Sequence, residues 1–280
     1  MAGFDPRLTP ARPDLAASHL RGKIEAARFV NGTAQEVIVG QAPVRDAPSH
    51  GATMPTEALR GERVTVYETD DEGWAWGQLA SDGYVGWLPA AALLAPGPAP
   101  THKVAALRTL VFPGPSIKLP PTDALPLGAR IALAREEQSF AITAAGGYVP
   151  KRHLVPIAGK ESDFVAVAER FLGAPYLWGG KTSTGIDCSG LVQVALTACG
   201  IVCPRDSDMQ EAALGKPVKL TELRRGDLLF WKGHVAIARD NATVIHANAF
   251  HMSVAIEPVT DAVGRIKAAG LEVTAVKRVL

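Results

Sequence analysis

The sequence predicts an α+β protein with a β-rich amino-terminal half and a carboxy-terminal domain of mixed α and β structure. Residues 35–94 form short runs of alternating, β-branched or aromatic residues broken by Gly, Pro and Asp, which is typical of short strands. A weaker copy of this pattern follows a Pro- and Gly-rich stretch at 95–100. From Asp163 the apolar period becomes helical, with one face formed by Phe164, Val167, Ala168 and Phe171.

Composition indicates a folded protein whose partners are small molecules. The 280 residues are 47% hydrophobic and 20% charged, and 29 basic against 28 acidic side chains give a formal charge of +1. No overall field attracts nucleic acid or an anionic membrane, so we expect neither as a partner. The first twenty residues lack the apolar run of a secretory signal, which predicts a cytoplasmic protein. Three cysteines in a reducing compartment are not expected to form a stable disulfide, and this includes Cys199 with Cys203.

Residues 15–29 place Ala16, Leu20, Ile24 and Ala27 on one helical face. This spacing predicts a short helix that docks onto the rest of the protein.

The β-rich half contains an internal repeat. The first copy ends in Asp82-Gly83-Tyr84-Val85-Gly86-Trp87-Leu88-Pro89, and the second in Gly146-Gly147-Tyr148-Val149-Pro150. Two small β-barrels in tandem account for both copies. The ending of the first copy resembles that of bacterial SH3 domains closely, and the ending of the second resembles it in part.

These patterns predict five segments along the chain. They are an amino-terminal helical arm (1–33), a first SH3-like barrel (34–95), a linker (96–102), a second SH3-like barrel (103–157) and the carboxy-terminal domain (158–280).

Cys188 is the candidate nucleophile. It directly precedes a helical pattern of Leu191, Val192, Ala195, Leu196 and Cys199 that Gly200 closes. At a helix amino terminus, unpaired N–H groups and the macrodipole lower a cysteine pKa and favour the thiolate, whereas burial opposes this.

Two histidines supply a candidate base and its partner. The stretches around His234 and His246 read as two strands joined by a turn at residues 239–241. A hairpin centred on Asp240 would place the two histidines opposite each other, close enough for one ring to hydrogen-bond the other. His234 would then accept the Cys188 proton while His246 fixes its tautomer.

Other interpretations of these residues remain open. Cys188, His234 and His246 also form a plausible zinc ligand set, but no compact ligand spacing supports it. We expect structural roles for the other histidines, which are His19, His50, His102, His153 and His251.

The carboxy-terminal motifs together resemble the NlpC/P60 peptidases across about residues 160–280. The motifs are Pro175-Tyr176-Leu177-Trp178-Gly179-Gly180, Asp187-Cys188-Ser189-Gly190-Leu191-Val192, Arg225-Gly226-Asp227-Leu228, Gly233-His234-Val235 and Ile245-His246-Ala247. The resemblance implies a papain-like fold, with Cys188 as nucleophile, His234 as base and His246 as the third polar residue. It implies no metal and no organic cofactor.

The arrangement of two SH3 domains before an NlpC/P60 domain resembles that of enzymes that recycle murein peptides. The resemblance implies cleavage between γ-linked D-glutamate and the diamino acid in a small murein peptide with a free L-alanine amine. Asp187 and Ser189 would receive the ammonium group, Tyr84 of the first barrel would close that end of the groove, and Tyr176 and Trp178 would line it. Arg205, Ser207 and Gln210 would order the segment near the site.

Two alternatives of other kinds stay open. One is a noncatalytic wall-binding protein whose SH3 copies carry the function. The other is an amidase or acyltransferase that uses the same three residues. The sequence does not decide the diamino acid or the oligomeric state.

Overall fold

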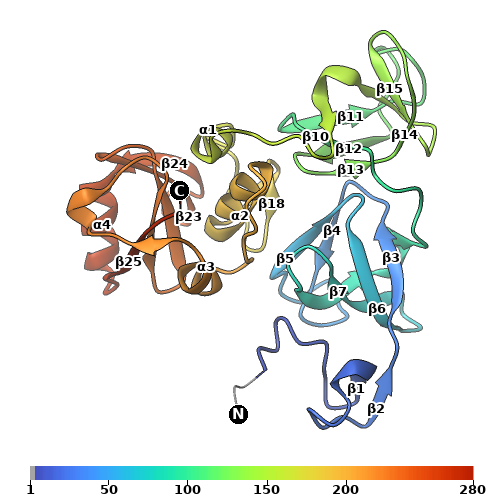
Figure 1. The fold of residues 1–280 in the computed structure, drawn as a ribbon, viewed down its shortest axis with the longest axis horizontal. Helices are drawn as coiled ribbons and strands as arrows, with labels where there is room; N and C mark the ends of the chain where they lie inside the picture. Colours follow the sequence, from blue (N-terminus) through green and yellow to red (C-terminus); the bar gives the residue numbers. More distant parts are fainter. Residues whose placement is uncertain (1–3, 280) are drawn as a thin grey trace. The chain divides into compact units, whose positions relative to one another are not determined.

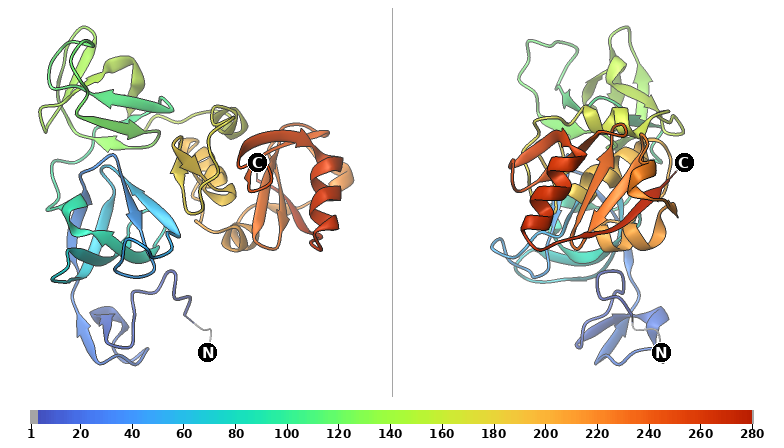
Figure 2. Two further views of the ribbon diagram at one scale, coloured as in Figure 1. Left: turned by 180° about the vertical axis from the view of Figure 1, so that it is seen from behind. Right: turned by 90° about the vertical axis from the view of Figure 1, so that its left-hand side faces the viewer.

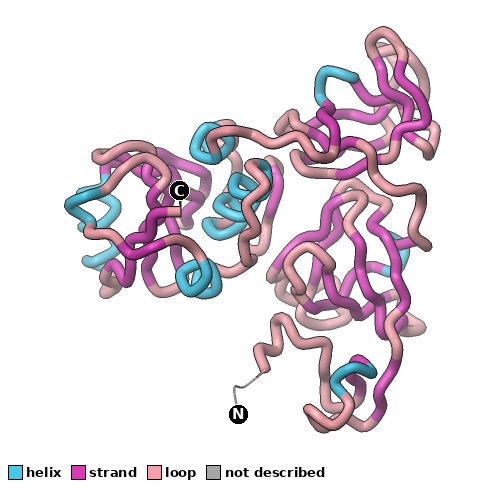
Figure 3. The backbone as a smooth tube through the Cα atoms, in the orientation of Figure 1, coloured by secondary structure: helices cyan, strands magenta, loops and turns pink. Residues whose placement is uncertain are grey.

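The computed structural model describes residues 4–279 and divides them into two compact units, between Ala158 and Gly159 (Figure 1). The first unit is built almost wholly of strands and loops, and the second combines helices with a sheet, so the α+β prediction is confirmed (Figure 3). None of the helices within residues 4–279 is long and apolar enough to cross a membrane. The first three residues of the predicted arm lie outside the described residues.

The first unit contains strands joined by short 3₁₀ turns. Its elements are β1 (Leu15–Ala17), η1 (Ser18–Leu20), β2 (Arg28–Val30), β3 (Thr33–Val37), β4 (Gln41–Val44), β5 (Thr56–Leu59), β6 (Arg63–Thr69), β7 (Trp74–Leu79), β8 (Val85–Pro89), η2 (Ala90–Ala92), β9 (Leu93–Leu94), β10 (His102–Val104), β11 (Arg108–Val111), β12 (Asp123–Pro126), β13 (Arg130–Ile131), β14 (Leu133–Glu136), β15 (Phe140–Thr143), β16 (Tyr148–Pro150), η3 (Lys151–His153) and β17 (Leu154–Pro156).

The second unit alternates helices with the strands of one large sheet. Its elements are α1 (Phe164–Glu169), β18 (Lys181–Thr182), β19 (Gly185–Ile186), α2 (Cys188–Ala198), α3 (Ser207–Ala213), β20 (Lys216–Pro217), η4 (Leu220–Glu222), β21 (Asp227–Trp231), β22 (His234–Ala238), β23 (Thr243–Asn248), β24 (Ser253–Pro258), α4 (Val259–Ala268) and β25 (Val273–Arg278).

The predicted helix at residues 15–29 is wrong. The segment instead forms the parallel strand pair β1 and β2, separated by the turn η1. Leu15, Ala16 and Ala17 are all fully buried, which is not the one-sided burial of a surface helix, and Leu15 packs with the rings of Trp74, Trp76 and Trp87. Tertiary burial against this aromatic surface outweighs the weak helical pattern.

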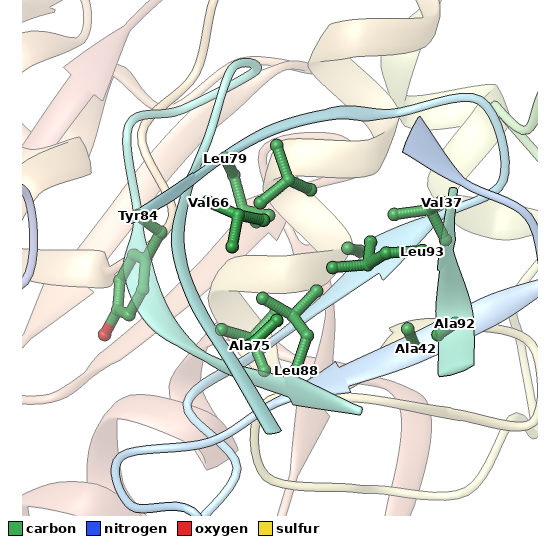
Figure 4. Close-up of a cluster of buried hydrophobic side chains, with 12 residues drawn as sticks. Val37, Ala42, Val66, Ala75, Leu79, Tyr84, Leu88, Ala92 and Leu93 are labelled. Carbon is green, nitrogen blue, oxygen red and sulfur yellow. The ribbon is translucent and has the colours of Figure 1, made fainter. Parts of the chain in front are cut away.

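The first barrel is a five-stranded sheet in the order β8-β7-β6-β3-β9, completed by the hairpin β4-β5. Alternate residues of β6, such as Val64 and Val66, face a core shared with Val37, Leu79 and Leu88. Figure 4 shows this core, with Tyr84 at one end of it and the tyrosine hydroxyl directed away from the aliphatic side chains.

The second barrel has a pairing pattern similar to that of the first, but its strands form two three-stranded sheets. Strand β10 pairs with β13 and with the last strand β17, a hairpin β11-β12 follows β10 in the chain, and β14-β15-β16 form a meander. The Phe112–Tyr148 bridge matches the Arg45–Trp87 bridge of the first barrel. The internal repeat read from the sequence is therefore present in the topology.

The sheet of the second unit is antiparallel throughout, in the order β20-β25-β21-β22-β23-β24. Ala262 and Ile266 of α4 pack against Leu229, Trp231 and Ala236 on one face. Figures 1 and 2 show α2 on the opposite side of the sheet from α4. Helix α2 contacts the central strands β22 and β23, which carry the two candidate histidines.

The two barrels of the first unit approach each other closely at Gly61. The Arg130 N–H donates to the Arg60 carbonyl oxygen over 2.8 Å. Gly61 has a φ of +78°, and a Cβ atom there would lie 2.3 Å from the Arg130 backbone oxygen. This position therefore requires glycine both for its backbone conformation and for its space.

We expect Gly61→Ala to lower the free energy of unfolding by about 2–4 kcal/mol, because it adds a steric clash to the left-handed strain. Gly73→Ala is the matched control, since Gly73 has a φ of +88° with no atom within 4 Å of the added carbon. The control should lose only about 1–2 kcal/mol. Urea unfolding followed by tryptophan fluorescence measures both, and equal losses would contradict the close approach.

Candidate active site

Cys188 is the first residue of α2, and Asp187 is its N-cap. The Gly190 N–H donates to Asp187 Oδ1 over 2.7 Å, which satisfies one of the N–H groups left without partners in the first turn. Most residues of α2 are buried, and many of them are apolar. Gly200, with a φ of +76°, follows the end of the helix as predicted. The local sequence therefore places the Cys188 side chain at the start of a buried helix.

The first turn of α2 packs against the backbone of the Gly179-Gly180 segment. A Cβ atom at position 190 would lie 2.3 Å from the Gly180 carbonyl oxygen. Gly190 in the Asp-Cys-Ser-Gly motif thus lets the helix start approach this loop.

A buried ion pair holds the same turn in place. Arg205 donates from Nη2 to Asp187 Oδ2 over 2.6 Å, and from Nη1 to Asp187 Oδ1 and to Ser189 Oγ over 3.0 and 2.8 Å. Gln210 Nε2 donates to the Ser189 carbonyl oxygen over 2.9 Å. These contacts agree with the ordering role predicted for Arg205 and Gln210, and the role of Ser207, the first residue of α3, stays a prediction.

Both Asp187 oxygens are already hydrogen-bonded within the chain. Oδ2 also accepts from the Gly179 N–H over 2.8 Å, and the carboxylate is 7% exposed. Its charge is balanced by Arg205, which is 1% exposed. The predicted binding of a substrate ammonium group by Asp187 and Ser189 stays a prediction.

The electrostatic state of Cys188 differs from the expectation of a low pKa. Burial, first of all, and then the negative charge of Asp187 raise the pKa of Cys188 to about 12, while the Val235 N–H, Arg205 and the Ser189 N–H act in the opposite direction. Desolvation of a buried thiolate outweighs stabilisation by the helix terminus. The hydrogen bond from Val235 places the sulfur beside the strand on which His234 is the preceding residue.

The predicted contact between the two histidine rings is confirmed. His234 Nε2 lies 2.8 Å from His246 Nδ1. The predicted hairpin register is wrong by one residue at its centre: Ile237 pairs with Ile245 and Ala238 with Val244, so the hairpin is centred on Asn241. The rings meet as diagonal neighbours, which side chains of this length can bridge.

Both histidines are neutral at pH 7. Burial lowers the pKa of His234 to about 3, with further lowering by His246 and Arg265. Burial likewise lowers the pKa of His246 to about 3, with further lowering by Arg265 and His251. A neutral His234 has a lone pair and can accept a proton.

Glu257 is part of this constellation and was missed by the sequence analysis. Its Oε1 atom lies 2.7 Å from His246 Nε2, and Arg265 of α4 donates to the same oxygen. Glu257 is 8% exposed and lies on β24, directly opposite Val244. The alternation of β24 could have indicated it, because Ala255 is opposite His246 and residue 257 shares its face.

Tyr176 lies near the sulfur, and Trp178 is on the surface. Burial raises the pKa of Tyr176 to about 12, and the charges of Cys188 and Asp187 act in the same direction, so its hydroxyl stays a donor. Trp178 is 62% exposed, so its side chain is not part of the core. Tyr84 is 4% exposed in the core of the first barrel. The substrate-binding roles of all three stay predictions.

Within residues 4–279, the side chains grouped closely enough to hold a metal are His246, His251 and Glu257, whose ligand atoms lie within 4.8 Å of one another. This is not the Cys188, His234 and His246 set considered from the sequence. Glu257 Oε1 already makes hydrogen bonds with Arg265 and with His246 Nε2. His251 Nδ1 is hydrogen-bonded to Asn248 Oδ1. We assign no metal to this group. Within the described residues Cys199 and Cys203 are not joined to each other, and the expectation that they form no stable disulfide stays a prediction.

The raised pKa of Cys188 predicts slow alkylation that accelerates with pH. The rate with iodoacetamide should increase about tenfold per pH unit from pH 7 to 9 without a plateau, because the thiolate fraction grows in that proportion below the pKa. Mass spectrometry of the Cys188 peptide measures the rate, and Cys188→Ala gives the background from the other two cysteines. A rate that is flat from pH 5 to 8 would reveal a preformed thiolate and contradict this prediction.

Comparisons with known proteins agree with the two units. The family described as NlpC/P60 matches residues 173–267, and the bacterial dipeptidyl-peptidase SH3 domain matches residues 44–93. The SH3 match lies within the first barrel, from the end of β4 to β9, and assignment of the second barrel to the same domain family stays a prediction.

Two relatives match most of the chain. The gamma-D-glutamyl-L-lysine dipeptidyl-peptidase of Bacillus subtilis is 31% identical over 236 residues, which are 75% of this chain and 77% of that protein. The protein of the same name from Bacillus cereus is 27% identical over 244 residues, 74% of this chain and 71% of its own.

A crystal structure of an NlpC/P60 family protein from Bacillus cereus has the same fold, with a TM-score of 0.74 and 23% identity over 89% of this chain and all of that one. The buried cysteine, the histidine pair and these similarities lead to one conclusion: the chain belongs to the NlpC/P60 family and is a cysteine peptidase with an SH3-like amino-terminal region.

Proposed function

We propose that this peptidase hydrolyses the γ-D-glutamyl–diamino acid bond of murein peptides that carry a free amino-terminal L-alanine. The observation that carries the proposal is the hydrogen-bonded pair His234–His246 on strands packed against the helix that begins at Cys188. The names of the two Bacillus relatives, which specify a γ-D-glutamyl-L-lysine bond, support this choice of substrate.

The proposed first step is attack by Cys188 on the amide carbonyl carbon. His234 Nε2 is engaged by His246, so Nδ1 is the nitrogen left to accept the thiol proton. Because the thiol and the imidazole are both neutral in the free enzyme, the proton moves as the S–C bond forms rather than beforehand. The Tyr176 hydroxyl, which keeps its proton, donates to the developing oxyanion.

The later steps return the enzyme to its starting state. The tetrahedral intermediate collapses when His234 gives its proton to the leaving amine, and the C–N bond breaks to leave a thioester on Cys188. Water, deprotonated by His234, then attacks the thioester carbon. The sulfur leaves and takes the proton back from His234, which restores both neutral groups.

The substrate amine is assigned to the end of the site beside Asp187 and Ser189. A buried carboxylate adjacent to the nucleophile suits an ammonium group, which would share Asp187 with Arg205. A role for Tyr84, a cytoplasmic location and a place in murein recycling remain predictions from the sequence.

Hydrolysis of L-Ala-γ-D-Glu-diaminopimelate, followed by release of the L-Ala-γ-D-Glu dipeptide, tests the activity. We expect Cys188→Ala to lower kcat/KM by at least about 10⁴-fold, because no other group replaces the nucleophile. Full activity in this variant would remove Cys188 from the mechanism. A tripeptide with L-lysine as the third residue shows which diamino acid is preferred.

An N-acetylated copy of the same peptide tests recognition of the amine. Loss of a charged hydrogen-bonding group should reduce kcat/KM by about 10- to 150-fold. Cleavage of both peptides at equal rates would overturn the free-amine requirement. If the folded protein cleaves neither the free nor the N-acetylated peptide, its substrate is a different amide.

A further inference from the structure

The two histidines belong to a series of hydrogen bonds that ends at the positive charge of Arg265. Arg265 on α4 donates to Glu257 on β24, Glu257 Oε1 lies 2.7 Å from His246 Nε2, and His246 Nδ1 lies 2.8 Å from His234 Nε2. His246 and Glu257 are 1% and 8% exposed. Little water competes for these hydrogen bonds, so each group depends on its neighbour in the line.

Glu257 decides which nitrogen of each ring carries the hydrogen. A carboxylate only accepts, so His246 Nε2 must be the N–H that donates to Glu257. A neutral His246 then has its lone pair on Nδ1, which accepts from the Nε2–H group of His234. The lone pair of His234 is thereby left on Nδ1.

The opposite arrangement would disable the base. If His246 carried its hydrogen on Nδ1, it would donate to His234 Nε2, and His234 would then carry its own hydrogen on Nδ1. That nitrogen could no longer accept the Cys188 proton. The acceptor-only character of Glu257 excludes this arrangement.

We propose that Glu257 is a positioning residue of this peptidase: it fixes the tautomers of His246 and, through it, His234, so that His234 Nδ1 is ready to take the Cys188 proton. The inference rests on the proposed role of His234 as the base. Arg265 in turn donates a hydrogen bond to Glu257 Oε1, and its guanidinium stacks on Phe250 at 4.4 Å.

The first test reads the tautomers directly in the substrate-free full chain. Two-bond ¹⁵N–¹H couplings in a histidine-selective NMR spectrum distinguish the Nδ1–H, Nε2–H and doubly protonated forms, and His234→Gln and His246→Gln assign the signals. We expect both rings to be Nε2–H tautomers at pH 7. An Nδ1–H tautomer on either ring overturns the proposal, whether or not the enzyme cleaves murein peptides.

The second test uses Glu257→Gln, which keeps the shape but can also donate a hydrogen bond. We expect a fraction of His246 to change to the Nδ1–H tautomer and kcat to fall by about 10- to 100-fold, the usual effect of losing a residue that orients a functional histidine. KM should stay within about twofold, because Glu257 is proposed to act on the base rather than on the substrate.

Glu169→Gln is the matched control, because Glu169 also accepts from two arginines, Arg225 and Arg239. It should leave the tautomers and kcat unchanged. Arg265→Gln should leave the Glu257–His246 bond and the Nε2–H tautomers in place. If Glu257→Gln keeps wild-type tautomers and kcat, or if both glutamate variants lose kcat equally, Glu257 has a structural role only. If Glu257→Gln does not fold, the tautomers of the wild-type protein still decide.

Discussion

The buried ion pair between Arg205 and Asp187 is the interaction on which the site depends. Asp187 is at once the N-cap of α2, the acceptor for the Gly179 loop and the counter-ion of Arg205. Removal of either partner would leave an uncompensated buried charge, which typically costs about 3–5 kcal/mol. The loss would fall on the turn that positions Cys188, so the geometry of this proposed nucleophile is tied to the stability of the ion pair.

The charged groups of the second unit surround Cys188 and His234, the proposed nucleophile and base, which are both neutral. Burial disfavours both the thiolate of Cys188 and the imidazolium of His234, and each neutral form is favoured in the free enzyme. In the proposed mechanism, transfer of the proton from Cys188 to His234 is therefore delayed until a carbonyl carbon is in place to bond the sulfur. Such an arrangement would protect the thiol from other electrophiles, while the tautomers proposed for His246 and His234 would keep His234 Nδ1 ready to accept a proton.

Residues close together in the chain were predictable, whereas contacts between distant segments were not. Cys188 at a helix start, the strands at 234 and 243, and the repeat of the barrels all follow from local periodicity. The hairpin register depends on turn geometry, and a one-residue difference in its centre is not visible in the pattern of apolar residues. Glu257 lay outside any motif, since its role comes from a neighbouring strand and from α4.

The structure of the amino-terminal arm was also not predictable from local sequence, and its contacts bear on the function of the first barrel. Its predicted helix is replaced by strands because Leu15 packs against three tryptophan rings, and the Arg12 guanidinium stacks on Trp76 and Trp87 at 4.4 and 4.8 Å. These rings are only 3–8% exposed. A wall-binding role for this aromatic surface would require the arm to leave, exposing Leu15 and breaking the contact of Arg12 with Glu68. The surface is therefore occupied by the chain itself, which favours a catalytic over a wall-binding protein.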